Sequence, residues 1–255
     1  MILKGRKALL AVILICSLSV ANSAKSHPIS TLINAKFSIT PVQLEISEFL
    51  SDLSNQKFWT FVNGLTKLSP GIDERENDLE KYKIALKLAN RQLSNAQMKL
   101  LKLSLSLRSL TPRIQSHLLI ADDILERGDC GESFTSFVIS GKEIICSIEE
   151  LKKKSGSALT NSDLYSFDHI YPGTETNTQV VILYGEIGSK SFNEFHNYLK
   201  TELQKGVLKY VVRHFVRNPS DTKVRLSGYG VELHLKSTEY KAQDDSPRKD
   251  NEEKF

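Results

Sequence analysis

The stretch QVVILYGEIGSKSFNEFHNYLKTELQKGVLKYVVRHFV, residues 179–216, decides how this chain folds. Its apolar run at 180–184 is short and rich in β-branched residues, which predicts a buried strand rather than a helix. A second run, 208–216, has the same character. Farther along, residues 231–235 alternate apolar and polar side chains, as a strand with one covered face does. Residues 178–240 therefore predict three strands of one open sheet.

The residues between the first two strands predict a helix. Gly188-Ser189 provides an N-cap, and Gly206 ends the helix. The apolar residues between these positions fall on one helical face: Phe192, Phe195, Leu199 and Leu203. A strand, a helix and a second strand are the order of an α/β fold with a right-handed crossover. This order resembles half of a thioredoxin-like domain.

The start of the chain has the composition of a secretory signal peptide. Three basic residues at positions 4–7 precede an apolar stretch at 8–20, and small residues follow at 21–24. The apolar stretch is shorter than the roughly 20 residues that a membrane span needs. We therefore expect residues 1–24 to be removed and the protein to enter the secretory pathway without a membrane span.

The composition limits the classes of partner. Of 255 residues, 40% are hydrophobic and 25% are charged, enough for one large core or two small ones. Removal of the signal peptide takes three of the 34 basic residues and leaves 31 of them against 30 acidic ones. A nearly neutral chain has no basic field for nucleic acid or an anionic membrane surface, so we expect neither partner.

The cysteines indicate a structural bond. Cys16 lies in the signal peptide, which leaves Cys130 and Cys146 in an oxidising compartment. We expect them to form a disulfide bond, which contributes roughly 3 kcal/mol on the chain-entropy model. A tight hairpin centred on Gly141 would place Ser136 rather than Cys130 opposite Cys146. The loop before the hairpin must therefore double back to bring the two cysteines together.

Residues 40–125 predict an all-α subdomain of five helices. Thr40-Pro41 and Thr111-Pro112 each predict an N-cap followed by proline at the first helical position. Residues 100–110 alternate leucine as a strand would, but the lack of β-branching favours a helix. Trp59 is expected at the edge of the core. Five apolar stripes need a partner surface, so we expect this bundle to pack against the sheet or to be inserted into it.

The segment between the helices and the first strand predicts smaller elements. Residues 134–146 form two β-rich runs around a glycine, the pattern of a hairpin. Ser147 to Glu150 is a capping box that begins a short helix. Residues 155–178 are rich in Ser, Thr, Asn and Gly and predict a loop, and residues 32–37 predict an edge strand.

The sequence does not contain the residue motifs of several classes of catalysis. The junction of the first strand and its helix holds Gly185-Glu186-Ile187-Gly188 where a redox domain carries Cys-x-x-Cys, which excludes thiol–disulfide catalysis. The chain has Asp122-Asp123 and Asp244-Asp245 but no Asp-x-Asp pair, the common metal motif of nucleotide-sugar transferases. The six histidines show no metal-ligand spacing, and His214 is expected to be a satisfied core histidine rather than a base.

Several runs then carry a resemblance to a known family. LSGYGVEL at 226–233, followed by KSTEYKA at 236–242, closely resembles a segment of the UDP-glucose:glycoprotein glucosyltransferases. The runs YVVRHF at 210–215, LSLRS at 105–109 and KFW at 57–59 are similar to that family as well. The matches cover nearly the whole mature chain in order, and they place it at the first thioredoxin-like domain of the N-terminal region.

The resemblance implies a fold and a set of structural residues. It implies an α/β thioredoxin-like domain at 25–240 with the added helical subdomain, about residues 40–125, and a charged tail at 241–255. The cysteine pair fits the family. Its motif residues, which we expect to be structural rather than catalytic, are Arg213, His214, Ser227, Gly228, Tyr229, Gly230 and Glu232.

The resemblance also implies a place of action and a role. Family members are enzymes of the endoplasmic-reticulum lumen that sense misfolded high-mannose glycoproteins and transfer glucose to their N-glycans. Their catalytic domain, with UDP-glucose and a divalent cation such as Ca²⁺ or Mn²⁺, lies far beyond the matched segment. We therefore expect no catalytic, cofactor or metal residue in this chain. Its partners would be misfolded glycoproteins and the remaining thioredoxin-like and catalytic domains of a parent enzyme.

Two departures from the family keep other functions open. A retention tetrapeptide is absent at residues 250–255, and a proline cluster of the relatives is replaced by LERGD at 125–129. The sequence is interpreted as an N-terminal fragment, a truncated isoform or an incomplete gene product of such a glucosyltransferase. The alternatives are a stand-alone redox-inactive thioredoxin-like chaperone and a secreted scaffold protein.

Overall fold

The computed structural model describes residues 33–68, 78–128, 130–131, 134–154, 163–204, 206 and 208–226. Residues 34–225 form one compact unit. The expected signal peptide at 1–24, the third strand at 231–235 and the tail at 241–255 lie outside the described residues, and so do the domain limits drawn from them. No helix among the described residues is both long enough and apolar enough to cross a membrane.

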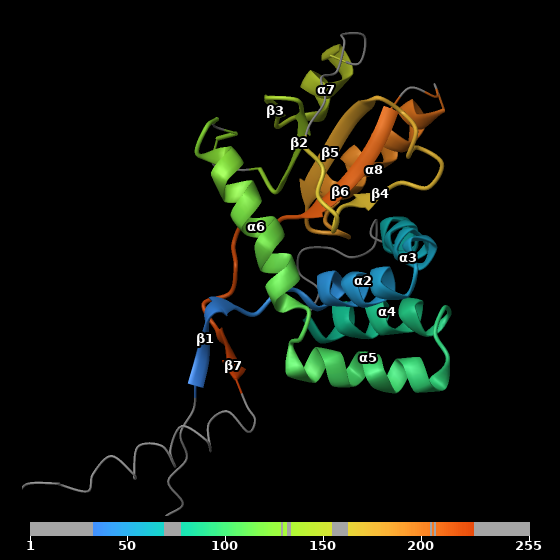
Figure 1. The fold of residues 1–255 in the computed structure, drawn as a ribbon, viewed down its shortest axis with the longest axis vertical. Coiled ribbons are helices and arrows are strands. Elements are labelled where there is room, and N and C mark those ends of the chain that lie inside the picture. Colours follow the sequence, from blue (N-terminus) through green and yellow to red (C-terminus); the bar gives the residue numbers. More distant parts are fainter. Residues whose placement is uncertain are drawn as a thin grey trace, which may run out of the picture. The chain divides into compact units, whose positions relative to one another are not determined.

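A five-stranded sheet with the order β3-β2-β5-β6-β4 forms the centre of this unit (Figure 1). The strands are β2 (Ser136–Ser140), β3 (Glu143–Ile145), β4 (His169–Ile170), β5 (Gln179–Gly185) and β6 (Leu208–His214). β5 and β6 run parallel, and the other neighbours are antiparallel. The α/β class predicted from the sequence is therefore confirmed, with α8 (Lys190–Leu203) as the crossover helix.

The edge strand of the five-stranded sheet was not expected. The sequence predicted a loop throughout residues 155–178, but His169 and Ile170 form β4 and pair with Val212 and Val211 of β6. Only two residues take part, and a strand of that length leaves no alternation in the sequence. The loop prediction is therefore wrong at this point, and β4 occupies the edge of the sheet beside β6.

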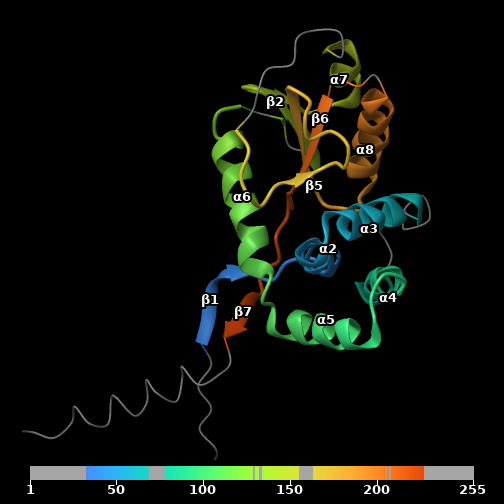
Figure 2. The ribbon, with the colours of Figure 1, turned by 45° about the vertical axis from the view of Figure 1, so that its right-hand side comes forward.

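The sheet is covered on both faces (Figure 2). Along β5, Val181 and Leu183 face the core that contains α8, whereas Ile182 and Tyr184 face the opposite core. That second core lies under α6, which contributes Leu118. Side chains alternate between the faces of a strand, so a continuous apolar run is the pattern of a strand buried on both sides.

All five predicted helices of the bundle are present. They are α2 (Val42–Leu53), α3 (Asn55–Leu68), α4 (Asp78–Asn90), α5 (Asn95–Leu107) and α6 (Thr111–Leu125). The ambiguous leucine-rich segment is helical, as favoured, and it begins with a capping box in which Ser94 and Gln97 exchange hydrogen bonds. Arg108 ends α5 in the left-handed conformation, with φ of 54°. Figures 1 and 2 show α5 as the helix farthest from the sheet.

The bundle and the sheet share one core. Leu44 of α2, Phe58 of α3 and Leu101 of α5 belong to the same buried cluster as Val181 of β5. Trp59 lies deeper than expected, at 2% exposure, and its ring N–H donates to the carbonyl of Ile170 at 2.8 Å. The helical subdomain therefore packs directly on the sheet. This was predicted, because the apolar faces of its five helices need a partner surface.

The smaller elements follow the sequence in part. The hairpin of β2 and β3 turns through Gly141, whose φ of 63° suits a glycine. Ser147 accepts a hydrogen bond from the backbone of Glu150, so α7 (Ile148–Lys154) begins where the capping box predicted. The predicted edge strand is β1 (Ile33–Ser38). Its partner β7 (Lys223–Leu226), with which it forms a separate two-stranded sheet, was not predicted.

Candidate functional site

The strand–helix junction where a redox enzyme carries its thiols holds no thiol. Ser189 caps α8 by accepting the backbone N–H of Phe192, so the helix begins as a thioredoxin-like helix would. Gly185 is packed so closely that an added Cβ would lie 2.5 Å from Oγ of Ser136. Cys130 and Cys146 instead form the expected disulfide bond, with their Cα atoms 5.4 Å apart. The described cysteines are thus structural.

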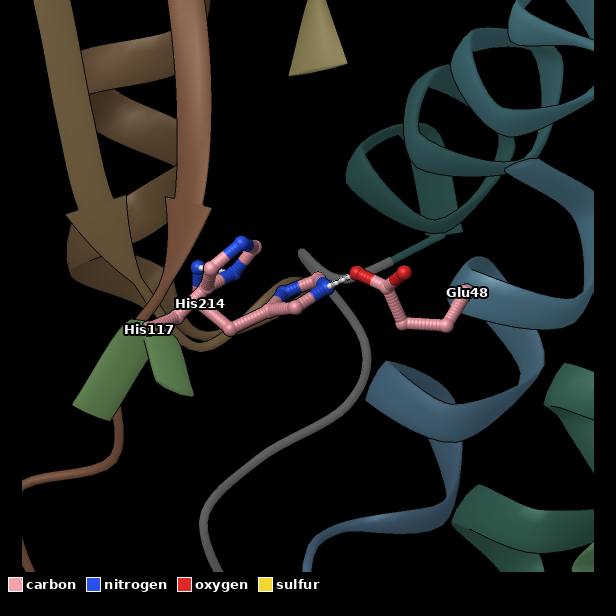
Figure 3. Close-up of side chains that lie close together, drawn as sticks. All are labelled: Glu48, His117 and His214. Carbon is pink, nitrogen blue, oxygen red and sulfur yellow. Dashed lines mark hydrogen bonds and ion pairs between the residues drawn. The ribbon is translucent and has the colours of Figure 1, made fainter. Parts of the chain in front are cut away.

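The polar centre of the unit is a cluster that we call the Glu48 cluster: Glu48, Arg113, His117, His169 and His214. These residues come from α2, α6, β4 and the end of β6. The side chains of Glu48 and of the three histidines are buried. Figure 3 shows His117 and His214 close together, with His214 pointing toward Glu48. The cluster joins the helical bundle to the carboxyl end of the parallel strands.

Glu48 accepts every hydrogen bond that the cluster directs at it. Its Oε1 accepts Nε2 of His169 at 2.7 Å and Nε2 of His214 at 2.6 Å. Its Oε2 accepts Nη1 of Arg113 at 3.1 Å. The other nitrogen of His169 lies 3.3 Å from the hydroxyl of Ser51. A buried carboxylate that is paired and hydrogen-bonded in this way avoids the penalty of an isolated charge.

Burial and hydrogen bonds shift the pKa values of Glu48, His117 and His214 in the same direction, downward. Burial alone would raise the pKa of Glu48, but the hydrogen bonds from His169 and His214 outweigh it and hold the pKa well below its usual range. Burial lowers the pKa of His214, although the hydrogen bond to Glu48 opposes the shift. Burial also lowers the pKa of His117 well below its ordinary value. The ionised Glu48 is thus held by the cation of Arg113 and by two histidine rings.

Glu48, His117 and His214 have the proximity of metal ligands, with one atom of each within 4.8 Å of the others. Hydrogen bonds already use one nitrogen of each of these histidines. The backbone N–H of His214 donates to Nδ1 of His117 at 3.1 Å, and Nε2 of His214 lies 2.6 Å from Oε1 of Glu48. The second ring nitrogens, Nε2 of His117 and Nδ1 of His214, are buried without a hydrogen-bond partner in the described part of the chain.

A second buried network lies on the opposite face of β6. Arg213 donates to both carboxylate oxygens of Asp168, at 2.6 and 2.7 Å, and to the backbone carbonyl of Asp163 at 2.7 Å. Its Nη1 donates to the hydroxyl of Tyr184 at 2.6 Å. Burial raises the pKa of Tyr184 to about 12, so the phenol stays protonated. The bidentate pair fixes the loop before β4 to the sheet.

Above this network lies a cavity of about 660 Å³, which we call the isoleucine groove. Its walls come from α6, β2, β3 and β5 and contain Ile120, Ile124, Ile139, Ile144 and Ile182. Tyr184 and Arg213 line it as well. Tyr184 is fully buried, and its hydroxyl accepts a hydrogen bond from Arg213. Charged side chains complete the lining: Asp123, Arg127, Lys142 and Asp163. A cavity that combines apolar and polar groups is typical of a binding site.

Both predicted threonine caps serve another purpose. α2 begins after Pro41 and α6 begins at Thr111, and neither helix has a side-chain cap. Thr40 and Thr111 instead donate to Oε1 of the buried Glu45, at 2.7 and 3.1 Å. Arg108 completes the set with an ion pair of 2.7 Å. The cap predictions are wrong because a buried carboxylate attracts both hydroxyls more strongly than a helix terminus does.

The structure describes only two of the predicted motif residues. Arg213 and His214 are neighbours on β6 and point to opposite faces, into the groove network and the Glu48 cluster respectively. Ser227, Gly228, Tyr229, Gly230 and Glu232 lie outside the described residues. His214 is buried, as expected of a core histidine, but it is only half satisfied: Nε2 lies 2.6 Å from Glu48, whereas Nδ1 has no hydrogen-bond partner among the described residues. Glu48 itself was read only as part of an apolar helix.

Comparison with known proteins identifies the fold. The profile of a thioredoxin-like domain family matches residues 39–223. The chain belongs to this thioredoxin-like domain family. Among curated proteins it is 47% identical, over 89% of its length, to a UDP-glucose:glycoprotein glucosyltransferase of Drosophila melanogaster. It is 40% identical to UDP-glucose:glycoprotein glucosyltransferase 2 of Homo sapiens over 88% of its length, and 40% identical to UDP-glucose:glycoprotein glucosyltransferase 1 of Mus musculus over 96%.

These matches confirm the resemblance predicted from the sequence motifs, and they cover the thioredoxin-like region. The chain spans only 15%, 14% and 16% of the lengths of those three relatives. A thioredoxin-like domain therefore accounts for the part that is shared. The activity and partners of the full-length relatives are not thereby shown for this chain.

Proposed function

We propose that this chain is a non-catalytic recognition part of a UDP-glucose:glycoprotein glucosyltransferase. It contacts misfolded N-glycoproteins in the lumen of the endoplasmic reticulum, to which the expected signal peptide directs it. UDP-glucose and the divalent cation belong to a catalytic domain elsewhere in the parent enzyme. The relatives support the family, and the 14–16% of their lengths that this chain spans supports a role as one part of a larger enzyme.

The isoleucine groove is the observation that carries this proposal. Its volume of about 660 Å³ exceeds that of any one side chain, and its lining combines five isoleucines with charged side chains such as Lys142 and Asp163. Folded glycoproteins bury their apolar segments, whereas misfolded ones expose them. A groove with these properties distinguishes the two without reading a particular sequence.

The test is equilibrium binding of the purified chain to denatured and native forms of one high-mannose glycoprotein. Ile120→Asp places a charge in the groove, and Ile144→Ser makes the opposite wall polar. Leu119→Asp is the matched control, because Leu119 is on the same helix, 68% exposed and outside the groove. We expect both groove variants to weaken binding of the denatured form about tenfold, and the control to retain it.

Two results would overturn the proposal. One is equal affinity for the denatured and native glycoprotein, and the other is undiminished binding by both groove variants. Thermal melts of each variant verify that it is folded. Labelled UDP-glucose with metal, added to the same denatured glycoprotein, tests the non-catalytic part separately, and we expect no label on the glycan.

A further inference from the structure

A second cavity lies on a different part of the unit, between α3, the end of α4 and α8. Its volume is about 550 Å³, and its lining includes Lys67, Arg91 and Lys200. None of its lining residues is shared with the isoleucine groove. We call it the cationic groove. It takes no part in the function proposed above.

The cations of this groove lack anionic partners. The lining contains three cationic side chains and no carboxylate. Among the described residues, the side chains of Lys67 and Arg91 make no hydrogen bond or ion pair, and Lys200 donates only to the neutral amide oxygen of Asn63, at 2.7 Å. Surface cations commonly stand near carboxylates, so three of them around one cavity leave an uncompensated positive field.

The ammonium group of Lys200 is held in place rather than free to leave. Oδ1 of Asn63 also accepts Nε2 of His196 at 3.2 Å, and Nδ2 of Asn63 donates to the carbonyl of Trp59 at 2.8 Å. The second nitrogen of His196 lies 2.8 Å from the hydroxyl of Tyr210. Burial and then the charge of Lys67 lower the pKa of Lys200. A bound anion would relieve both effects.

The rest of the lining contains two leucines beside the polar Thr60, Asn63 and Gln92. Leu68 is 47% exposed and Leu88 lies below it in the groove. α3 and α4 are in contact here, since a Cβ at Gly64 would lie 3.2 Å from a terminal methyl group of Leu88. An inorganic anion would leave the two leucines in contact with water. The combination suits a ligand with carboxylates next to an apolar side chain.

We propose that the cationic groove binds an acidic peptide segment that carries an apolar residue between its carboxylates. The positive charge of Lys67, Arg91 and Lys200 attracts the carboxylates, and the wall of Leu68 and Leu88 receives the apolar side chain. Charge complementarity selects this partner over a neutral or basic segment. The site and the isoleucine groove can be occupied independently.

The experiment is fluorescence anisotropy of the purified chain with a labelled peptide of Asp, Glu and Leu. A peptide with Asn and Gln at the acidic positions is the matched probe. We expect the acidic peptide to bind at least about tenfold more tightly, and an increase of NaCl from about 50 to about 500 mM to weaken it strongly. Lys67→Glu and Arg91→Glu should each weaken binding about tenfold.

Lys87→Glu is the control, since Lys87 is on α4, one turn before Arg91, and is exposed and outside the lining. Equal binding of the acidic and amide peptides would overturn the proposal, and so would an equal loss in the Lys87 variant. Tighter binding of a single-stranded RNA of equal charge would assign the groove to another class of ligand. A large gain in affinity when Asp73, Glu74 and Glu76 are neutralised would make a segment of this chain the occupant.

Discussion

At the scale of single residues, Glu48 is the side chain on which most contacts between the bundle and the sheet converge. It is fully buried, and it accepts from His169, His214 and Arg113. A glutamine at this position keeps one acceptor oxygen. Its NH₂ group would face the N–H donors that a carboxylate oxygen now accepts. The loss of a single partner from a buried ionic network is more harmful than the absence of the whole network.

Glu48→Gln should therefore lower the free energy of unfolding by about 3 kcal/mol. Asp52→Asn is the control, because Asp52 also pairs with Arg113 but is 47% exposed, and an exposed pair contributes less than about 1 kcal/mol. Urea unfolding followed by tryptophan fluorescence measures both, and Trp59 is buried in the shared core. Similar effects of the two changes would show that Glu48 is not a joint.

The buried histidines make stability depend on pH. Burial, with a smaller effect of Lys200, lowers the pKa of His196 to about 3. The folded protein keeps this ring neutral, while the unfolded chain takes up a proton below about pH 6.5. Stability is therefore fully present above that pH and is lost as the pH falls toward the folded pKa. His117 and His214, whose pKa values burial also lowers, add to the loss.

When the pH is lowered from about 6.5 to about 5, the free energy of unfolding should fall by about 2 kcal/mol for each histidine that stays neutral in the folded protein. Urea titrations at several pH values measure this slope. His196→Gln removes one titrating ring and should flatten it. A slope that is unchanged in this variant, or stability that rises on acidification, would contradict the assignment of a neutral buried His196.

At the scale of elements, the junction of β5 and α8 is fixed by close packing rather than by chemistry. A Cβ at Gly185 would lie 2.5 Å from Oγ and 3.0 Å from Cβ of Ser136, and 3.1 Å from the ring of Phe192. Gly185→Ala should therefore destabilise the protein by about 1–3 kcal/mol, since overpacking forces these neighbours apart. Thermal unfolding measures the effect.

Gly64→Ala is the control for this element, because the Cβ meets only the flexible end of Leu88, at 3.2 Å. Alanine also favours the helix over glycine by about 1 kcal/mol. We expect a neutral or stabilising result there. If the two substitutions destabilised the protein equally, the close approach at Gly185 would not be what sets the geometry of the junction.

The sequence predicted long periodic elements and missed short ones for physical reasons. The apolar runs of β5 and β6 and the face of α8 are long enough to establish a period. β4 has two residues and β7 has four, so neither shows one. In α4 the large Leu79 is 53% exposed, whereas the small Ala85 is buried. Size alone does not decide which side of a helix is covered.

The Glu48 cluster was beyond the reach of sequence patterns. Its histidines are at positions 117, 169 and 214 and have no common spacing, because α6, β4 and β6 bring them together only in the folded sheet. A charged residue between apolar neighbours, such as Glu48 in ISEFL, is the one signal that a reader could have used. The disulfide bond, in contrast, followed from the compartment alone.

At the scale of the whole molecule, the helical part depends on the sheet. Leu44, Phe58 and Leu101 share their core with residues of β5 and β6, and Glu48 loses two of its donors without β4 and β6. Residues 40–125 expressed alone should therefore show no cooperative melting, whereas residues 34–225 should melt in one transition. A soluble, cooperatively melting bundle would mean two independent domains.

The most direct test of the proposed function is hydrogen exchange of the chain with and without a denatured high-mannose glycoprotein. We expect added protection in α6 and in the hairpin of β2 and β3, the elements that contribute most walls of the isoleucine groove. The native glycoprotein should give none. α5, whose Leu103 is 54% exposed, should be unchanged in both cases. Protection confined to α5, or identical protection by native and denatured glycoprotein, would contradict recognition through the groove.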